Sequence, residues 1–214
     1  MKTAPPETLA GSASTRDRLL QSAASLFRTH GYAGATTREL ASSLGIQSAS
    51  LYHHMGKKED LLFELSVSAL ETITQQVGAA VLAAEPADRL RELIRAHLAA
   101  ALAQQDAHAV MLLELRALSS ERRALVLGLR RAYQELVERT LAEGQASNVI
   151  RADMPAQQLA LGLLNLLNWT IFWYRPDGEL SPGSLAELYA RIFIQGAAAD
   201  PLRVRSEDEV RGVR

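Results

Sequence analysis

ELASSLGIQSASLYHHM, residues 39 to 55, consists of two short helical patterns that meet at one glycine, Gly45. The apolar side chains of this stretch can form one small core if the two helices cross steeply at that glycine; they are Leu40, Leu44, Ile46 and Leu51. Ala41 is small enough for close approach, and Gly45 can adopt the left-handed conformation of a tight turn. The stretch therefore predicts a helix-turn-helix over about residues 36–55.

The second helix of this unit would turn polar side chains outward, and a polar helix fits the major groove of DNA. In that interpretation Gln47 and Ser48 read base edges. The full set of predicted DNA contacts is Thr36, Thr37, Arg38, Gln47, Ser48, Ser50, Tyr52, His53, Lys57 and Lys58. The alternative is an ordinary helical hairpin with a solvated face, and the spacing alone does not separate the two.

Most of the remaining sequence also has helical periodicity, with apolar residues at three- and four-residue spacing and no sustained alternation of period two. We therefore expect an all-α fold. Glycine and proline positions predict helices over residues 15–30, 36–44, 47–54, 57–84, 87–103, 107–118, 121–143, 155–173 and 184–198. We expect residues 1–13 to form a flexible leader and residues 200–214 a flexible charged tail.

Composition excludes several classes of protein. The 214-residue chain has no cysteine, which excludes disulfides and thiolate metal sites, and its 48% hydrophobic and 22% charged residues are ordinary for a globular protein. No signal peptide or membrane-spanning run is evident, so a cytoplasmic protein without a membrane partner is expected. Residues 1–60 hold seven Lys/Arg against five Asp/Glu, a balance compatible with a nucleic-acid contact at this end.

Catalytic and metal-binding patterns are absent from the sequence. His97 and His108 lie on separate predicted helices without the spacing of metal ligands. There is no nucleophile elbow, phosphate-binding loop or dinucleotide fingerprint. We therefore expect no metal, no cofactor and no enzymatic activity.

The segment TTRELASSLGIQSASLYHHMGKKEDLL, residues 36–62, resembles the DNA-binding domain of TetR-family transcriptional regulators. The resemblance begins upstream at residues 23–27 and Gly31-Tyr32 and covers about 50 residues. Two positions depart from the family pattern: Gln47 replaces a small hydroxyl residue that caps the recognition helix, and Met55 replaces phenylalanine. The resemblance implies a three-helix DNA-binding domain over residues 14–60 and an effector-binding and dimerisation domain over residues 61–199. It also implies a homodimeric repressor of double-stranded palindromic operator DNA that responds to a small molecule.

The last two predicted helices have the broad apolar surfaces that a dimer interface requires. Residues 159–173 are apolar on almost every side, so more than one neighbour must cover them. Pairing with a second copy would form a four-helix bundle across the interface. We predict that the interface contains Leu159, Leu163, Leu166, Leu185, Leu188 and Ile192. In the alternative, both helices are buried inside one monomer.

Residues 118–145 and 167–181 resemble the branch of the family that responds to acyl-coenzyme A thioesters. An acyl chain requires an apolar slot, and coenzyme A requires cations at its mouth. The effector residues predicted on this basis are Met111, Leu115, Arg116, Arg130, Leu164, Asn168, Trp169 and Trp173. Three alternatives remain open: the arginines form a solvated helix face, the tryptophans belong to the dimer core, or the effector is a drug or aromatic compound. From a different class, a helical binding module or enzyme that does not bind DNA is the competing function.

Overall fold

The computed structural model describes residues 14–47 and 56–197, and this part of the chain is all-helical, as predicted. Its α-helices are α1 (Thr15–Gly34), α2 (Thr37–Ser43), α4 (Lys58–Ala83), α5 (Arg89–Ala103), α6 (Gln105–Leu113), α7 (Ser120–Ala146), α8 (Ala156–Trp173) and α9 (Pro182–Ala197). A 3-10 turn, η1 (Leu115–Ala117), joins α6 to α7. The predicted leader and tail and most of the predicted third helix, with Ser48, Ser50, Tyr52 and His53, lie outside the described residues.

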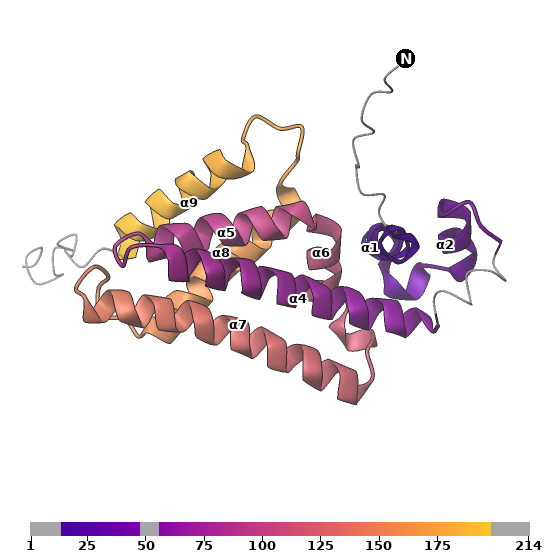
Figure 1. Cartoon of the computed structure of the whole chain (residues 1–214), viewed down its shortest axis with the longest axis horizontal. Coiled ribbons are helices and arrows are strands. Elements are labelled where there is room, and N and C mark those ends of the chain that lie inside the picture. The colour runs from indigo at the N-terminus through magenta and orange to yellow at the C-terminus, as the bar shows by residue number, and fades with distance from the viewer. Residues whose placement is uncertain (1–13, 48–55, 198–214) are drawn as a thin grey trace, which may run out of the picture.

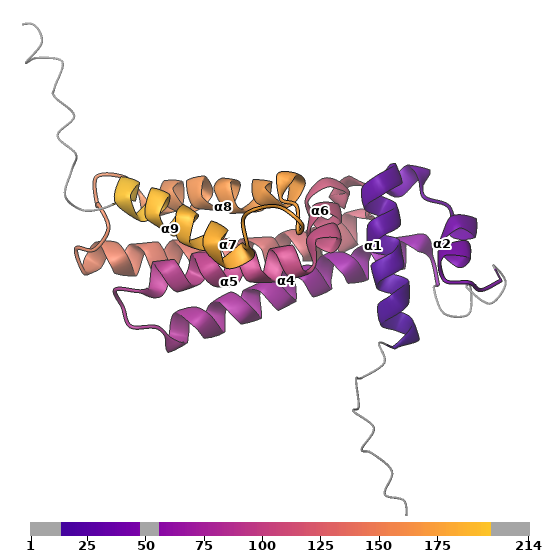
Figure 2. The same cartoon turned by 90° about the horizontal axis from the view of Figure 1, so that it is seen from above.

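The helices form an elongated bundle with α1 and α2 at one end (Figure 1, Figure 2). Helix α4 starts at that end and runs along the bundle, where it packs against α5, α6 and α7. Helix α8 packs against α7, and α9 packs against α5. Within the described residues no helix is both long and apolar enough to cross a bilayer.

Two hydrophobic cores lie along this bundle, and α4 contributes to both. The first core joins α1 and α2 to the first half of α4 and to α6; its largest side chains include Leu19, Phe27, Leu40, Leu61 and Leu62. The second core joins the second half of α4 to α5, α7, α8 and α9; it includes Leu93, Leu98, Leu141, Leu163 and Leu167. Helix α4 therefore connects the two cores along the bundle.

One helix boundary agrees with its prediction and another differs. Gly31 ends the regular first helix, as expected, because its φ of +70° and ψ of 158° are not helical; a short helical segment continues beyond this kink to Gly34. The helix predicted over residues 107–118 stops at Leu113, and a 3-10 turn follows. This break turns Leu115 and Leu118 into the first core, where they are 7% and 4% exposed.

Candidate DNA-binding surface and effector cavity

The turn that follows α2 has the geometry expected of a helix-turn-helix. The N-cap of α2 is Thr36, whose hydroxyl accepts a hydrogen bond from the Glu39 amide at 3.2 Å, while the Glu39 carboxylate accepts from the Thr36 amide at 2.9 Å. Gly45 has φ +66°, which confirms the expected left-handed turn, and the Ile46 amide donates to the Ala41 carbonyl oxygen at 3.0 Å. The chain therefore leaves α2 in a fixed direction.

Several predicted DNA contacts lie on the surface at this end of the bundle. Arg38, Gln47 and Lys57 are exposed, and Thr37 is half-buried in the first turn of α2. Thr36 is also exposed, although its hydroxyl is already used in the helix cap. Arg38 lies in the first turn of α2, and Lys57 is the N-cap of α4. Cations at a helix N-terminus suit phosphate groups, which also bind the free backbone amides there.

Lys58 has a structural role that the sequence did not predict. Its Nζ donates to the carbonyl oxygens of Tyr32 at 2.7 Å and Ala35 at 2.9 Å, and it lies 4.4 Å from the centroid of the Tyr32 ring. Two of its three N–H donors are therefore used inside the protein, where they hold the α1–α2 connection against the start of α4. The third N–H donor of Nζ is not used by these two hydrogen bonds, so the DNA contact of Lys58 stays a prediction.

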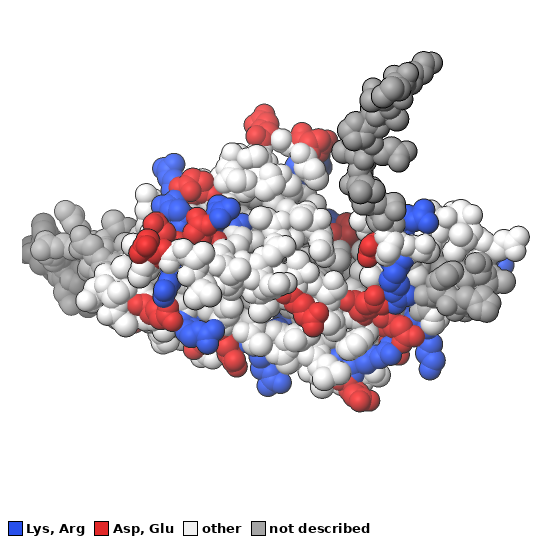
Figure 3. Space-filling model, viewed as in Figure 1, with Lys and Arg blue, Asp and Glu red and all other residues white. Residues whose placement is uncertain are grey.

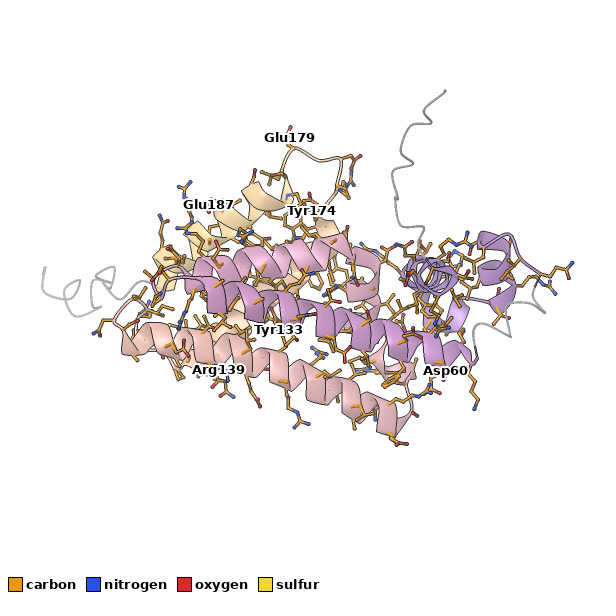
Figure 4. The ribbon with its side chains drawn as sticks, viewed as in Figure 1. Asp60, Tyr133, Arg139, Tyr174, Glu179 and Glu187 are labelled. Carbon is orange, nitrogen blue, oxygen red and sulfur yellow. The ribbon has the colours of Figure 1, made fainter. Side chains whose placement is uncertain are left out.

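The first turn of α4 is tied to the beginning of α7. Arg122 Nη2 donates to Asp60 Oδ1 at 2.5 Å, and the Ser119 amide donates to Glu59 Oε1 at 2.9 Å. The amide of Lys57, and then Arg122, hold the pKa of Asp60 below its usual value, because both stabilise the ionised carboxylate. Figure 3 shows acidic and basic side chains side by side around this junction, and Figure 4 shows Asp60 at the start of α4.

A second tie connects α1 to the end of α8. Arg28 Nη2 on α1 donates to the Ile171 carbonyl oxygen at 3.0 Å, and its Nη1 lies 3.3 Å from the Asp106 carboxylate on α6. Gln105 Nε2 donates to the same Ile171 oxygen at 2.8 Å and to the Tyr174 oxygen at 3.1 Å. Cations and N–H donors at a helix C-terminus satisfy its free carbonyl groups. Helices α1, α6 and α8 are thereby joined.

A cavity of about 550 Å³ lies between α4, α6, α7 and α8. It is lined by Leu70, Ile73, His108, Met111, Leu112, Leu127, Arg130, Arg131, Tyr133, Gln134, Leu161, Leu164, Asn165 and Asn168. Apolar side chains therefore share the wall with two arginines and three amides, and this volume is within the usual range of ligand pockets. Four of the predicted effector residues are among these: Met111, Arg130, Leu164 and Asn168.

The other four predicted effector residues do not line this cavity. Leu115 is buried in the first core, and Arg116 is exposed on η1, because the chain turns away after Leu113. Trp169 and Trp173 are 67% and 46% exposed, on a different side of α8 from Leu164 and Asn168. One residue along a helix rotates the side chain by about 100°, so Trp169 cannot share the direction of Asn168.

Ten of the fourteen lining residues are not among the predicted effector residues, and two of these ten are the polar residues His108 and Tyr133. His108 precedes Met111 and Leu112 by three and four positions, so helical periodicity places all three on one face. This periodicity is the sequence signal that places His108 beside the predicted effector residue Met111.

A second hollow of about the same volume lies between α1, α4 and the α5–α6 connection. Its charged lining residues are Asp17 and Asp106, and no arginine or lysine lines it. Because an anionic ligand would meet two carboxylates there, the cavity that contains Arg130 and Arg131 is the better site for an anion.

The predicted dimer residues divide into two groups. In the first group, Leu159, Leu163 and Leu185 are buried in the second core of the same chain, at 8%, 0% and 0% exposure, and Leu166 packs half-buried against that core. Leu188 and Ile192 on α9 are 40% and 55% exposed. Trp169 and Trp173 on α8 are exposed as well, and we call these four residues together the α8–α9 face.

Two family models and a curated relative match this chain. The family model "Bacterial regulatory proteins, tetR family" matches residues 19–65, and the model "Tetracyclin repressor-like, C-terminal domain" matches residues 83–197, more than half of the chain. The transcriptional repressor KstR2 of Mycolicibacterium smegmatis is 30% identical over 197 residues, which are 89% of this chain and 94% of that protein.

Two solved structures are similar over most of their length. The ketosteroid transcriptional regulator KstR2 of Mycobacterium tuberculosis has a TM-score of 0.82 at 26% identity, covering 89% of this chain and 99% of that one. AibR in complex with isovaleryl coenzyme A and operator DNA has a TM-score of 0.73 at 26% identity, covering 88% and 100%. The chain therefore belongs to the TetR family of bacterial regulatory proteins and is a DNA-binding transcriptional regulator, not an enzyme.

Proposed function

We propose that the protein is a homodimeric repressor of palindromic operator DNA in the cytoplasm, released from that DNA when an acyl-coenzyme A thioester enters the cavity between α4, α6, α7 and α8. The observation that carries the proposal is the combination of apolar walls and two arginines in this one cavity. A structural relative, AibR, has been solved with an acyl-coenzyme A and operator DNA together. That relative supports the effector class proposed here.

The lining of the cavity suits the two chemically different ends of a thioester. Met111, Leu112 and Leu164 provide an apolar wall for the acyl group. Arg130 and Arg131 provide guanidinium groups, which form strong charge-assisted hydrogen bonds with phosphates. A volume of about 550 Å³ suits an acyl group of moderate size, so the nucleotide of coenzyme A would lie across the mouth.

The α8–α9 face supplies the proposed dimer interface. Trp169, Trp173 and Ile192 expose large apolar surfaces, and an exposed apolar patch of this kind is typical of a protein–protein contact. A twofold interface formed by α8 and α9 joins the same surface of two copies. Such a dimer presents two helix-turn-helix units, which matches the twofold symmetry of a palindromic operator.

The route from cavity to DNA would use helix α4 and the tie between α1 and α8 described above. Helix α4 lines the cavity through Leu70 and Ile73, and its first turn holds Lys57 and Lys58. Helix α8 lines the cavity through Leu164 and binds Arg28 of α1 through the Ile171 carbonyl. A ligand that moves α8 relative to α4 therefore moves α1 as well. Half-sites lie about 34–36 Å apart, so a small change in helix separation prevents both units from binding.

We expect acyl-coenzyme A thioesters to weaken operator binding by at least about tenfold, a coupling of about 1.4 kcal/mol. A duplex selected by the protein from a random pool serves as the operator, and fluorescence anisotropy measures its Kd with and without each thioester or free acid. Replacing Arg130 and Arg131 by alanine should leave the Kd for DNA within about twofold but require at least about tenfold more thioester, because the phosphate contacts are lost.

Arg139→Ala is the matched control, since Arg139 is an exposed arginine of α7 outside the cavity. If thioesters release the operator from the double variant as readily as from the control, the proposed phosphate contacts of Arg130 and Arg131 are refuted. If drugs or free aromatic acids release the protein from the operator and thioesters do not, the proposed effector class is wrong.

A further inference from the structure

Three buried polar side chains form a cluster at the inner wall of the cavity. His97, His108 and Tyr133 are 0%, 1% and 5% exposed. His97 Nδ1 lies 2.6 Å from the Tyr133 hydroxyl oxygen, and Tyr133 projects from α7 toward the centre of the bundle (Figure 4). His108 and Tyr133 line the cavity directly. The Nε2 atoms of both histidines have no hydrogen-bond partner among the described residues.

The state of His108 follows from its surroundings. Burial lowers its pKa to about 4, so the imidazole is neutral near pH 7, with one nitrogen protonated and the other an acceptor. Nδ1 lies 3.4 Å from the Gln104 carbonyl oxygen. Because a carbonyl oxygen only accepts hydrogen bonds, the hydrogen belongs on Nδ1, and Nε2 is an unpaired acceptor.

An unpaired acceptor inside a close-packed bundle is unfavourable unless a donor reaches it. Helix ends or loop amides often provide such a donor, yet His108 lies in the interior of α6, and it is one of the residues that line the cavity. The cavity also contains Arg130 and Arg131, whose positive charges disfavour a cationic donor such as an ammonium group. A neutral hydroxyl group meets both conditions, since it donates one hydrogen bond and carries no charge.

We propose that His108 is a specificity-determining residue of the effector cavity, and that its Nε2 accepts a hydrogen bond from a hydroxyl group on the apolar part of the effector. This inference rests on the proposed function, because it assumes that the effector enters this cavity. A hydroxylated acyl group is then bound in preference to the same acyl group without the hydroxyl. The preference arises because the unsubstituted chain leaves the His108 acceptor unpaired, and a site built to hydrogen-bond a hydroxyl rejects the analogue that lacks it.

Isothermal titration calorimetry with hexanoyl-coenzyme A and its 2-, 3- and 6-hydroxy derivatives tests the inference. We expect at least one hydroxy derivative to bind the wild-type protein at least about tenfold more tightly than hexanoyl-coenzyme A. His108→Phe, which is similar in size but has no acceptor, should reduce that ratio to within about twofold. His108→Gln, which can place an acceptor oxygen in the same region, should retain part of the preference.

Circular dichroism and unchanged operator affinity show that each variant is folded. Equal binding of all four thioesters to the wild type, or a preference that survives in His108→Phe, overturns the inference and leaves the proposed function intact. Binding of none of the four, with operator binding unaffected by any thioester, overturns both this inference and the proposed effector class.

Discussion

Trp169→Glu combined with Ile192→Asp is expected to convert the protein into a monomer and to weaken operator binding by at least about 100-fold. Both side chains lie on the α8–α9 face, at 67% and 55% exposure, so acidic replacements are tolerated in the isolated chain. In a dimer the same carboxylates would be buried against apolar groups without a partner, which is strongly unfavourable. The loss of DNA affinity follows because two linked helix-turn-helix units bind much more tightly than one.

Analytical ultracentrifugation gives the mass in solution, and fluorescence anisotropy gives the Kd for the operator. Leu82→Asp with Val149→Asp is the matched control, since these apolar residues are 83% and 41% exposed but lie outside α8 and α9. The control should remain a dimer and bind DNA normally. A dimeric mass for the α8–α9 variant would show that another surface joins the two copies.

Arg38→Glu combined with Lys57→Ser is expected to weaken operator binding by at least about 100-fold near 0.1 M salt, since phosphate neutralisation supplies much of the affinity. Arg38 is exposed in the first turn of α2, where a glutamate is compatible with the helix dipole, and serine is a good N-cap for α4. The fold should therefore be preserved. The slope of log Kd against log salt should also decrease, by about two to four for the dimer.

A control with the same change in charge separates a local contact from a general electrostatic effect. Arg139→Glu combined with Arg95→Ser changes exposed residues of α7 and α5, far along the bundle from α2. Its Kd and salt slope should stay close to those of the wild type. If both double variants lose affinity equally, net charge and not a contact at α2 governs binding.

Local features of this fold were predictable from the sequence. Gly45 ends α2 in the left-handed conformation that its position between two helical patterns required. The cap of α2 by Thr36 also has a local signal, because threonine followed three positions later by glutamate is typical of a capping box. These features depend on neighbouring residues, so periodicity and turn chemistry are sufficient to find them.

Long-range features were not predictable in the same way. The acceptors of Lys58 are backbone carbonyls 23 and 26 residues away, which no side-chain pattern reveals. Helix α8 is apolar on nearly every side, so its sequence does not indicate that Leu163 faces the chain's own core whereas Trp169 faces outward. The pairing of His97 with Tyr133 joins residues on α5 and α7 and depends on how those helices pack.

The separation of the two helix-turn-helix units is the central quantity of this account, because effector binding is proposed to act by changing it. The chain has no cysteine, so Ser42→Cys, at an exposed position of α2, carries a single spin label per subunit. Double electron–electron resonance then measures the distance between the two labels of a dimer. With operator DNA we predict one narrow distance distribution, and with the thioester that releases the operator best we predict a shift of several ångström. An identical distribution with and without saturating thioester, or no measurable distance between labels, would contradict the account.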